Sequence, residues 1–386
     1  MLKKIIALTV VLFVISCNDV IQPIYKEKLV YVVPDLFKDF TPPTDSIVSI
    51  RDKQWVQNNF KKFIKSRKFN GSILIAKNDE IIFDTVIGYT DFKSRKQLAD
   101  TNAFQLASIS KPITATVILQ MIAEGKIKLE DKLTSFFPFL PKKPYKDISV
   151  KMLLSHQSGL GQYYYYCDAL VKNKRKFLTH EYVLDLIKKR NPGHDFKPGL
   201  RFSYCNTNYM FLAMIAEKVD GLHFSKIVEN RIIKPSNMNN SFVLNINENT
   251  PPNYIVMGND GANRKVGFDF LDGIVGDKGM FATAKDLYQF DRSLFNCNLI
   301  PDSLYQIATE PHTKIDKNKS AYGLGWRLRF NEELGKIVYH TGWWHGNRHI
   351  YFKIPSKDYT VIILSNSLKG STYNLNEMLE VFYHVN

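Results

Sequence analysis

Cysteine is scarce in this chain of 386 residues, which contains only four. The three that follow the N-terminal region, Cys167, Cys205 and Cys297, are an odd number at wide spacing, which excludes a disulfide framework. One bridge and three free thiols are both compatible with this count. The chain has no C-x-x-C pair, which argues against a zinc site. Its 26 Phe and 20 Tyr supply ample material for an apolar core.

Glycine and proline are also few, 20 and 16 residues, which excludes a fibrous or low-complexity chain. Acidic residues are outnumbered, because 37 Asp and Glu stand against 52 Lys and Arg and give a formal net charge of +15. The basic residues are scattered, and no nucleic-acid-binding motif is present. We expect no nucleic-acid partner. The excess charge suits attraction to anionic surfaces such as phospholipid headgroups or acidic cell-wall polymers.

Long apolar runs are missing except near the N-terminus. Ile5 to Ile15 is too short to span a bilayer, and it follows Lys3 and Lys4. It runs into Val14-Ile15-Ser16-Cys17, which resembles a bacterial lipobox with Cys17 as the lipidated residue. We expect residues 1–16 to be a lipoprotein signal peptide and 17–50 a tether. The protein would be exported and lipid-anchored to a bacterial cell membrane, on the periplasmic or outer face. An ordinary secretory signal with a chance cysteine is the alternative.

Residues 51–386 read as one domain of α/β (α+β) class. Two strand-like segments lie near its start and three near its end, with helical segments at both termini and a largely helical lobe at about residues 123–280. The expected fold is an antiparallel five-stranded-type sheet covered by N- and C-terminal helices, with the helical lobe inserted. The strands are expected at 71–76, 81–89, 336–340, 349–354 and 359–365, with turns at 342–346 and 355–358, and the terminal helices at 54–64 and 373–382.

The strongest chemical signal is S-x-x-K, formed by Ser108 and Lys111 at the start of a helical pattern that ends near Gly125. Residues i and i+3 share one face of a helical turn. A serine hydroxyl becomes nucleophilic when a base takes its proton, and a nearby lysine amine can help to do so. Ser110 is expected to point elsewhere. Taken alone, the pattern is also compatible with an N-cap serine and a surface lysine.

Two further motifs follow in order. Tyr204-Cys205-Asn206 lies at a turn before another helix, and His340-Thr341-Gly342 lies at the end of a strand. S-x-x-K, Y-x-N and H-T-G in this sequence resemble the serine β-lactamase and penicillin-binding-protein superfamily, in particular its class C-like branch with D,D-peptidase and esterase relatives. The resemblance extends from about residue 55 to 384. It implies a β-lactamase/transpeptidase-like fold and catalysis through an acyl-enzyme.

The resemblance also implies a role for each motif residue. Ser108 would be acylated, Lys111 would hydrogen-bond Ser108 and share the proton work, and Tyr204 would be the general base that later protonates the leaving group. Asn206 would orient Lys111 and contact the substrate. The strand at Thr341 and Gly342 would bind the substrate edge-on, and the backbone N–H groups of Ser108 and Trp343 would form the oxyanion hole.

His340 departs from the family pattern, because many relatives carry lysine there. A histidine has an ordinary pKa near 6.5, and beside Lys111 its charged form is disfavoured further, so we expect it to be neutral at pH 7. This weakens the case for penicillin hydrolysis, whose substrates carry a carboxylate, and favours esterase-like or D-amino-acid peptidase activity. It also leaves Lys111 as the main activator of Tyr204.

The sequence therefore predicts a serine hydrolase that acts on an ester or amide, with a D-amino-acid peptide as one candidate substrate. A class C-like β-lactamase and a non-turnover module that binds penicillin or peptidoglycan fragments are the alternatives. No cofactor or metal is expected, since His340, His345 and His349 lie in a strand–turn–strand segment. Tyr163–Tyr166 is interpreted as packing or as a substrate entrance. Trp343 and Trp344 are expected to crowd the site. The oligomeric state is left open.

Overall fold

The computed structural model describes residues 48–246, 251–369 and 374–385. The expected signal peptide, its lipidation site Cys17 and nearly all of the tether lie outside these residues. None of the helices described is both long and apolar enough to cross a bilayer. The three cysteines of the described chain are free thiols.

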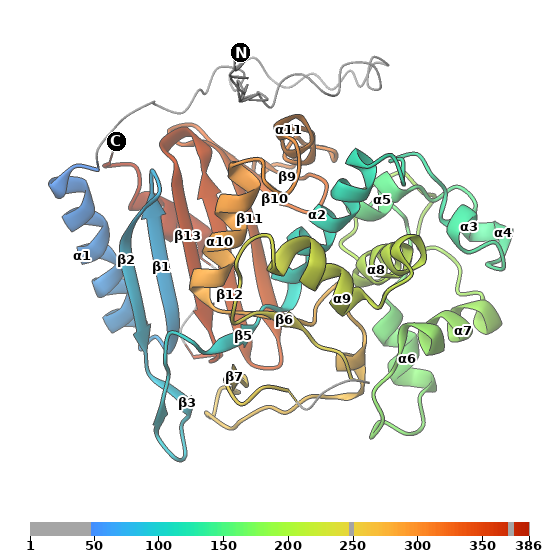
Figure 1. The fold of residues 1–386 in the computed structure, drawn as a ribbon, viewed down its shortest axis with the longest axis horizontal. Coiled ribbons are helices and arrows are strands. Elements are labelled where there is room, and N and C mark those ends of the chain that lie inside the picture. The colour runs from blue at the N-terminus through green and yellow to red at the C-terminus, as the bar shows by residue number, and fades with distance from the viewer. Residues whose placement is uncertain (1–47, 247–250, 370–373, 386) are drawn as a thin grey trace, which may run out of the picture.

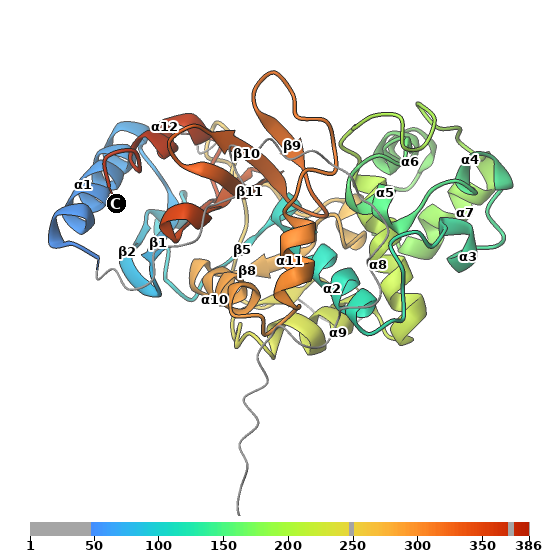
Figure 2. The ribbon, with the colours of Figure 1, turned by 90° about the horizontal axis from the view of Figure 1, so that it is seen from above.

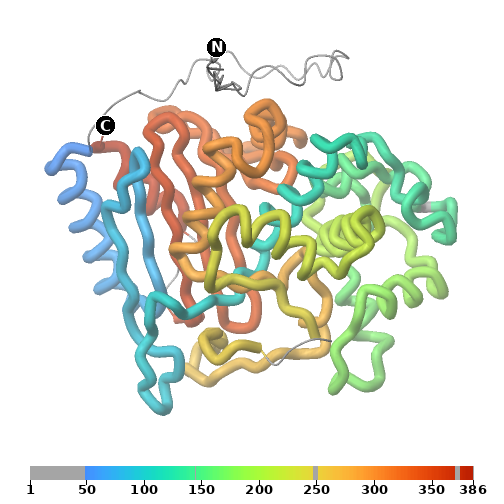
Figure 3. Tube along the Cα trace, in the orientation of Figure 1, coloured from blue at the N-terminus to red at the C-terminus, as the bar shows by residue number. Residues whose placement is uncertain are grey.

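A seven-stranded antiparallel sheet forms the centre of the fold (Figure 1). All five predicted strands are present, and N-terminal β1 pairs with C-terminal β13 from Gly71↔Ser365 to Lys77↔Tyr359. Figure 3 shows these distant segments side by side. The strand order is β2-β1-β13-β12-β11-β10-β9, with bounds β1 Gly71–Lys77, β2 Glu80–Ile87, β9 Ser320–Tyr322, β10 Arg327–Asn331, β11 Gly335–Trp344, β12 Asn347–Ile354 and β13 Tyr359–Ser365.

Two details of the sheet differ from the sequence prediction. The short strands β9 and β10 extend it at one edge and were not predicted. The turn predicted at 342–346 is present but shorter, because β11 continues to Trp344 and pairs with β12 as far as Trp344↔Asn347. His345 and Gly346 make the reversal, both with positive φ (44° and 81°), as a tight hairpin requires.

The sheet separates two apolar cores. The helices α1 (Ile50–Arg67) and α12 (Leu375–Glu380) cover one face, as predicted, while α2 (Ser110–Ala123) and α10 (Ala284–Phe295) lie on the other (Figure 2). Alternating residues of β13 serve the two sides. Ile363 packs in the core under α1 and α12, and Ile362 and Leu364 pack in the larger core that continues into the helical lobe.

The helical lobe lies at one side of the sheet (Figure 1). Its central helix is α8, which packs against α2 and so connects the lobe to the sheet layer. A small four-stranded sheet, ordered β6-β8-β5-β7, underlies the junction. The remaining helices and strands of the fold are α3 Leu133–Phe136, α4 Lys142–Tyr145, α5 Val150–Leu154, α6 Tyr163–Leu170, α7 His180–Arg190, α8 Asn206–Asp220, α9 Phe224–Val228, α11 Asp302–Ala308, β3 Tyr89–Asp91, β4 Lys96–Gln97, β5 Ala103–Gln105, β6 Phe242–Val243, β7 Ile255–Val256 and β8 Met280–Ala282.

Candidate active site

Ser108 lies in a short 3-10 turn, η2 (Ala107–Ile109), between β5 and α2. β8 anchors the turn, because the Leu106 N–H donates to the Met280 carbonyl at 2.8 Å. Ala107 has φ 50°, an unusual backbone for a residue with a side chain, directly before the serine. Ser108 is half-buried. Ser110 is turned inward as expected, with its Oγ accepting from the Met280 N–H at 3.2 Å.

Lys111 is fully buried, and its amine is held between two oxygens. Its Nζ donates to Ser108 Oγ at 3.0 Å and to the carbonyl oxygen of Asp277 at 2.8 Å. A second bond from α2 reaches the same loop, because Thr114 Oγ1 donates to the Gly276 carbonyl at 2.7 Å. The interpretation of Lys111 as a surface lysine is therefore wrong. The sequence could not reveal the contact between Lys111 and Asp277, because Asp277 makes this contact through its backbone carbonyl.

Tyr204 lies next to this pair, directly before α8. Lys111 Nζ is 4.9 Å from the centroid of the Tyr204 ring, and the ring is half-buried. Among the described residues its hydroxyl makes no hydrogen bond to Ser108 or Lys111. The three motif residues that were expected to share the proton work are thus brought together.

His156 supports Tyr204 from the loop after α5. It is fully buried, with its ring centroid 4.4 Å from that of Tyr204. Its Nδ1 accepts from the Cys205 N–H at 3.1 Å, so this nitrogen carries no proton. Burial lowers the pKa of His156 well below its ordinary value, and repulsion from Lys111 lowers it further. These contacts give His156 a structural hydrogen-bonding role.

Asn206 differs from its expected position. It is the first residue of α8, and its backbone N–H donates to Gln162 Oε1 at 2.8 Å. Its side chain makes no hydrogen bond to Lys111, whose donors are directed to Ser108 and Asp277 instead. The Asn206 Oδ1 is buried without a partner in the described structure. Lys111 is therefore oriented by a backbone carbonyl of the loop before β8.

β11 runs beside η2. β10 pairs with β11 only from Gly335 to Tyr339, so no described strand covers the same edge of β11 from His340 onward. A Cβ on Gly342 would lie 2.3 Å from the Leu106 carbonyl oxygen, so only glycine allows this approach. Trp343 is 58% exposed. Thr341 is half-buried.

His340 is fully buried, and its contacts define its protonation. Its Nδ1 faces the Thr341 carbonyl at 2.8 Å, which can only accept, so Nδ1 carries a proton. Its Nε2 lies 3.1 Å from the Tyr322 hydroxyl, which can donate to it. Burial lowers the pKa of His340 well below its ordinary value, and repulsion from Arg327 and Lys111 lowers this pKa further. The expected neutral imidazole is borne out.

Arg327 is a site residue that the sequence analysis missed. It is the first residue of β10, and its guanidinium carbon lies 4.8 Å from the centroid of the Tyr204 ring. Lys111 is thus not the only cation beside Tyr204 in the described structure. No spacing rule could have revealed this contact, because Tyr204 and Arg327 belong to separate elements that meet only in the folded chain.

A second buried amine lies behind Lys111. Lys278 is 4% exposed and donates to the Tyr163 hydroxyl at 2.6 Å, which in turn donates to Asp277 Oδ2 at 3.1 Å. Tyr163 therefore packs, whereas Tyr165 of the same run is 69% exposed. The indole of Trp344 donates to Asp272 Oδ1 at 2.8 Å. Trp344 is thus tied to Asp272 of the η4 turn (Phe270–Gly273).

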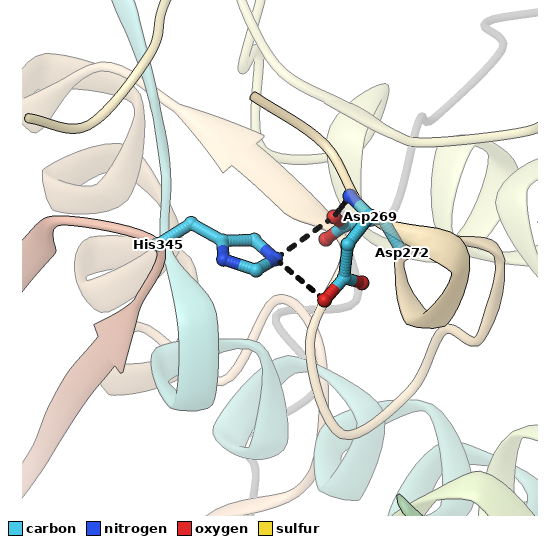
Figure 4. Close-up of side chains that lie close together, drawn as sticks. All are labelled: Asp269, Asp272 and His345. Atoms are coloured by element: carbon cyan, nitrogen blue, oxygen red, sulfur yellow. Dashed lines mark hydrogen bonds and ion pairs between the residues drawn. The ribbon is translucent and has the colours of Figure 1, made fainter. Parts of the chain in front are cut away.

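The cluster most suited to a cation among the described residues is Asp269, Asp272 and His345, whose ligand atoms all lie within 4.8 Å of one another (Figure 4). His345 Nε2 is 3.1 Å from Asp272 Oδ2 and 3.5 Å from Asp269 Oδ2. Burial would lower the pKa of His345, but its contacts with the Asp269 and Asp272 carboxylates raise it to about 9. At neutral pH the imidazolium is therefore the counter-ion of the two carboxylates.

A half-buried serine hydroxyl bonded to a buried lysine, beside a tyrosine and an open strand edge, defines a serine hydrolase of the acyl-enzyme type. The family model described as Beta-lactamase matches residues 56–381. The chain therefore belongs to the beta-lactamase family, within the serine β-lactamase and penicillin-binding-protein superfamily, as the motifs indicated.

Individual relatives agree with this assignment. Penicillin-binding protein 4* of Bacillus subtilis (strain 168) is 28% identical over 347 residues, 83% of this chain and 73% of the relative. Among solved structures, the octameric penicillin-binding protein homologue from Pyrococcus abyssi has a TM-score of 0.71 at 25% identity, covering 84% and 76% of the chains. D-amino acid amidase from Ochrobactrum anthropi SV3 has a TM-score of 0.69 at 21% identity, covering 86% and 98%. The chain spans less than two thirds of other curated relatives, 63% and 59%.

Proposed function

We propose that this protein is a serine hydrolase that cleaves an ester or amide through an acyl-enzyme on Ser108, with D-amino-acid amides and peptides as the favoured amide class. The observation that carries the proposal is the 3.0 Å bond between Ser108 Oγ and the buried amine of Lys111. Among the described residues, the other hydrogen bond of this amine is to the Asp277 carbonyl, which positions the amine for its contact with the serine.

The geometry supports a division of labour in the first half-reaction. Ser108 Oγ attacks the substrate carbonyl while its proton passes to Tyr204, with Lys111 bridging the two. The backbone N–H groups of Ser108 and Trp343 stabilise the oxyanion, since η2 and β11 lie side by side. Tyr204 then returns the proton to the leaving group. In the second half-reaction Tyr204 also takes the proton of the attacking water, because the sequence has no E-x-x-L-N segment that would supply a separate base.

The substrate preference follows from His340 and Asn206. A neutral, buried imidazole at position 340 gives no cation for a carboxylate next to the scissile bond, which favours small esters and amides over penicillins. The unpartnered Oδ1 of Asn206 can accept from an amide N–H of the substrate. The D-amino acid amidase neighbour supports this amide class.

Labelling with a fluorophosphonate tests the proposal. The wild type should be labelled and should hydrolyse p-nitrophenyl acetate or a D-amino-acid amide, and Ser108→Ala should lose both properties. Ser110→Ala, two residues away at the start of α2, is the matched control and should keep both. Equal labelling of wild type and Ser108→Ala would overturn the assignment. Rapid nitrocefin turnover would instead indicate a β-lactamase, and stable fluorescent-penicillin labelling without turnover would indicate a binding module.

We further propose that the enzyme works outside the cytoplasm on a lipid anchor at Cys17. The support is the sequence alone, a short apolar segment after Lys3 and Lys4 that ends in a lipobox-like Val14–Cys17. Expression with metabolic fatty-acid labelling should place lipid on the wild type. Cys17→Ala should remove the label, and a wild type without lipid would exclude the anchor.

A further inference from the structure

Tyr204 lies between two side chains of positive charge. Lys111 Nζ and the Arg327 guanidinium carbon lie 4.9 Å and 4.8 Å from the centroid of its ring. The two cations come from different parts of the fold, Lys111 from α2 and Arg327 from β10. Only Lys111 contacts Ser108, so Arg327 must be explained by something other than the nucleophile.

The surroundings of Tyr204 leave Arg327 without an acidic partner. In the described chain it forms no ion pair, and its buried Nε has no hydrogen-bond partner. Burial would lower the pKa of the guanidinium, but attraction to Tyr204, Tyr322 and Tyr339 leaves it raised. The charged or titratable groups facing Tyr204 are Lys111 from α2, His156 after α5, Tyr209 from α8, Tyr322 from β9, Arg327 from β10 and His340 from β11.

The two histidines in this set add no charge. The pKa values of His156 and His340 are both held well below the ordinary value by burial. A partly buried guanidinium without a carboxylate is stabilised when a negative charge forms nearby. The phenol oxygen of Tyr204 is where such a charge develops when the tyrosine acts as a base. Arg327 is therefore placed where Coulomb attraction strengthens as the reaction begins.

We propose that Arg327 is a positioning residue that holds Tyr204 and supplies the fixed positive charge that stabilises its phenolate form, a charge that neutral His340 cannot supply. This inference rests on the proposed function, in which Tyr204 is the general base. It adds a residue of the edge strand β10 to the site. It also explains how the site keeps two cations at the tyrosine although lysine is absent from position 340.

Kinetics of Arg327→Gln on p-nitrophenyl acetate, which has no carboxylate, tests the proposal. We expect kcat/KM to fall about 10- to 100-fold, part of the roughly 10²- to 10⁴-fold that a positioned general base contributes. Arg327→Lys should restore most of the loss. Arg329→Gln is the matched control, since Arg329 lies two residues along β10 and bonds Ser320 and Asn376 instead. Equal losses in Arg327→Gln and Arg329→Gln would mean a merely structural role.

The pH profile separates charge from packing. Loss of the fixed positive charge should move the acidic limb of kcat/KM to higher pH, whereas loss of packing alone should leave it in place. An unshifted limb would overturn the proposal. So would a loss confined to substrates that carry a carboxylate, such as nitrocefin, because Arg327 would then be a substrate anchor.

A spectroscopic readout keeps this test independent of turnover. The tyrosinate absorbance that Tyr204→Phe removes should develop at lower pH in the wild type than in Arg327→Gln. If the wild type shows this difference but lacks Ser108-dependent hydrolysis, the proposed function fails while the Arg327 assignment stands. If the absorbance develops at the same pH with and without Arg327, the assignment itself fails.

Discussion

His340 shows at the scale of one residue how burial selects chemistry. Its Nδ1–H donates to the Thr341 carbonyl and its Nε2 faces the Tyr322 hydroxyl, so both nitrogens already have partners and neither is free to bind a substrate. With Arg327 and Lys111 nearby, protonation would bring a third cation into a closed space. The residue therefore acts as a neutral spacer that joins β11 to β9.

His340→Lys should change substrate preference. We expect the ratio of kcat/KM for nitrocefin to that for p-nitrophenyl acetate to rise, because an ammonium group can bind the carboxylate of the β-lactam. The melting temperature should fall, because the new charge is buried beside two others. His340→Gln, which adds no charge, should leave the ratio unchanged. A ratio that stays constant in His340→Lys would count against the carboxylate argument.

Gly342 sets the distance between β11 and η2 at the scale of elements. Gly342→Ala would place a Cβ 2.3 Å from the Leu106 carbonyl oxygen, so the strand must move away from the serine turn. We expect kcat/KM to fall by at least 10-fold, with a stability loss of about 1–3 kcal/mol from overpacking. Gly193→Ala, whose Cβ would meet nothing within 4 Å, is the control. Normal activity in Gly342→Ala would show that this approach is not needed.

His345 joins the β11–β12 hairpin to the η4 turn, and the link depends on pH. Its folded-state pKa of about 9 lies above the ordinary value. The stabilisation is therefore complete below about pH 6.5 and is lost as pH rises through about 9. We expect His345→Gln to reduce the free energy of unfolding by about 1–2 kcal/mol at pH 6 and by nearly nothing at pH 10. Denaturant melts at both pH values would reveal it, and an equal deficit at both would exclude the ion pair.

At the scale of the whole molecule, the sheet unites both ends of the chain, so the site should be lost with the fold as one unit. Ile363→Ala, at a fully buried position of β13, should cost about 2–5 kcal/mol. Fluorophosphonate labelling of Ser108 and far-ultraviolet circular dichroism should then be lost at the same lowered temperature. Ile81→Ala, on the edge strand β2 at 41% exposure, is the control. Two separate transitions would contradict a single cooperative unit.

Local patterns predicted much of this molecule. The five predicted strands carry short apolar runs, and S-x-x-K places Ser108 and Lys111 on one turn by helical spacing alone. β9 and β10 are too short for such a signal. Arg327 acquires meaning only when β10 meets the loop before α8, and the Asp277 contact uses a carbonyl that every residue has. Because a backbone carbonyl leaves no signal in the sequence, the family resemblance assigned the support of Lys111 to Asn206.

The pairing of β1 with β13 has a consequence for biosynthesis. During synthesis β1 and β2 emerge before the helical lobe, whereas β13, which pairs with the other edge of β1, emerges only after it. Until β13 is made, the sheet cannot close between its N-terminal and C-terminal strands. The assembled site therefore belongs to a late stage of folding and not to the growing chain.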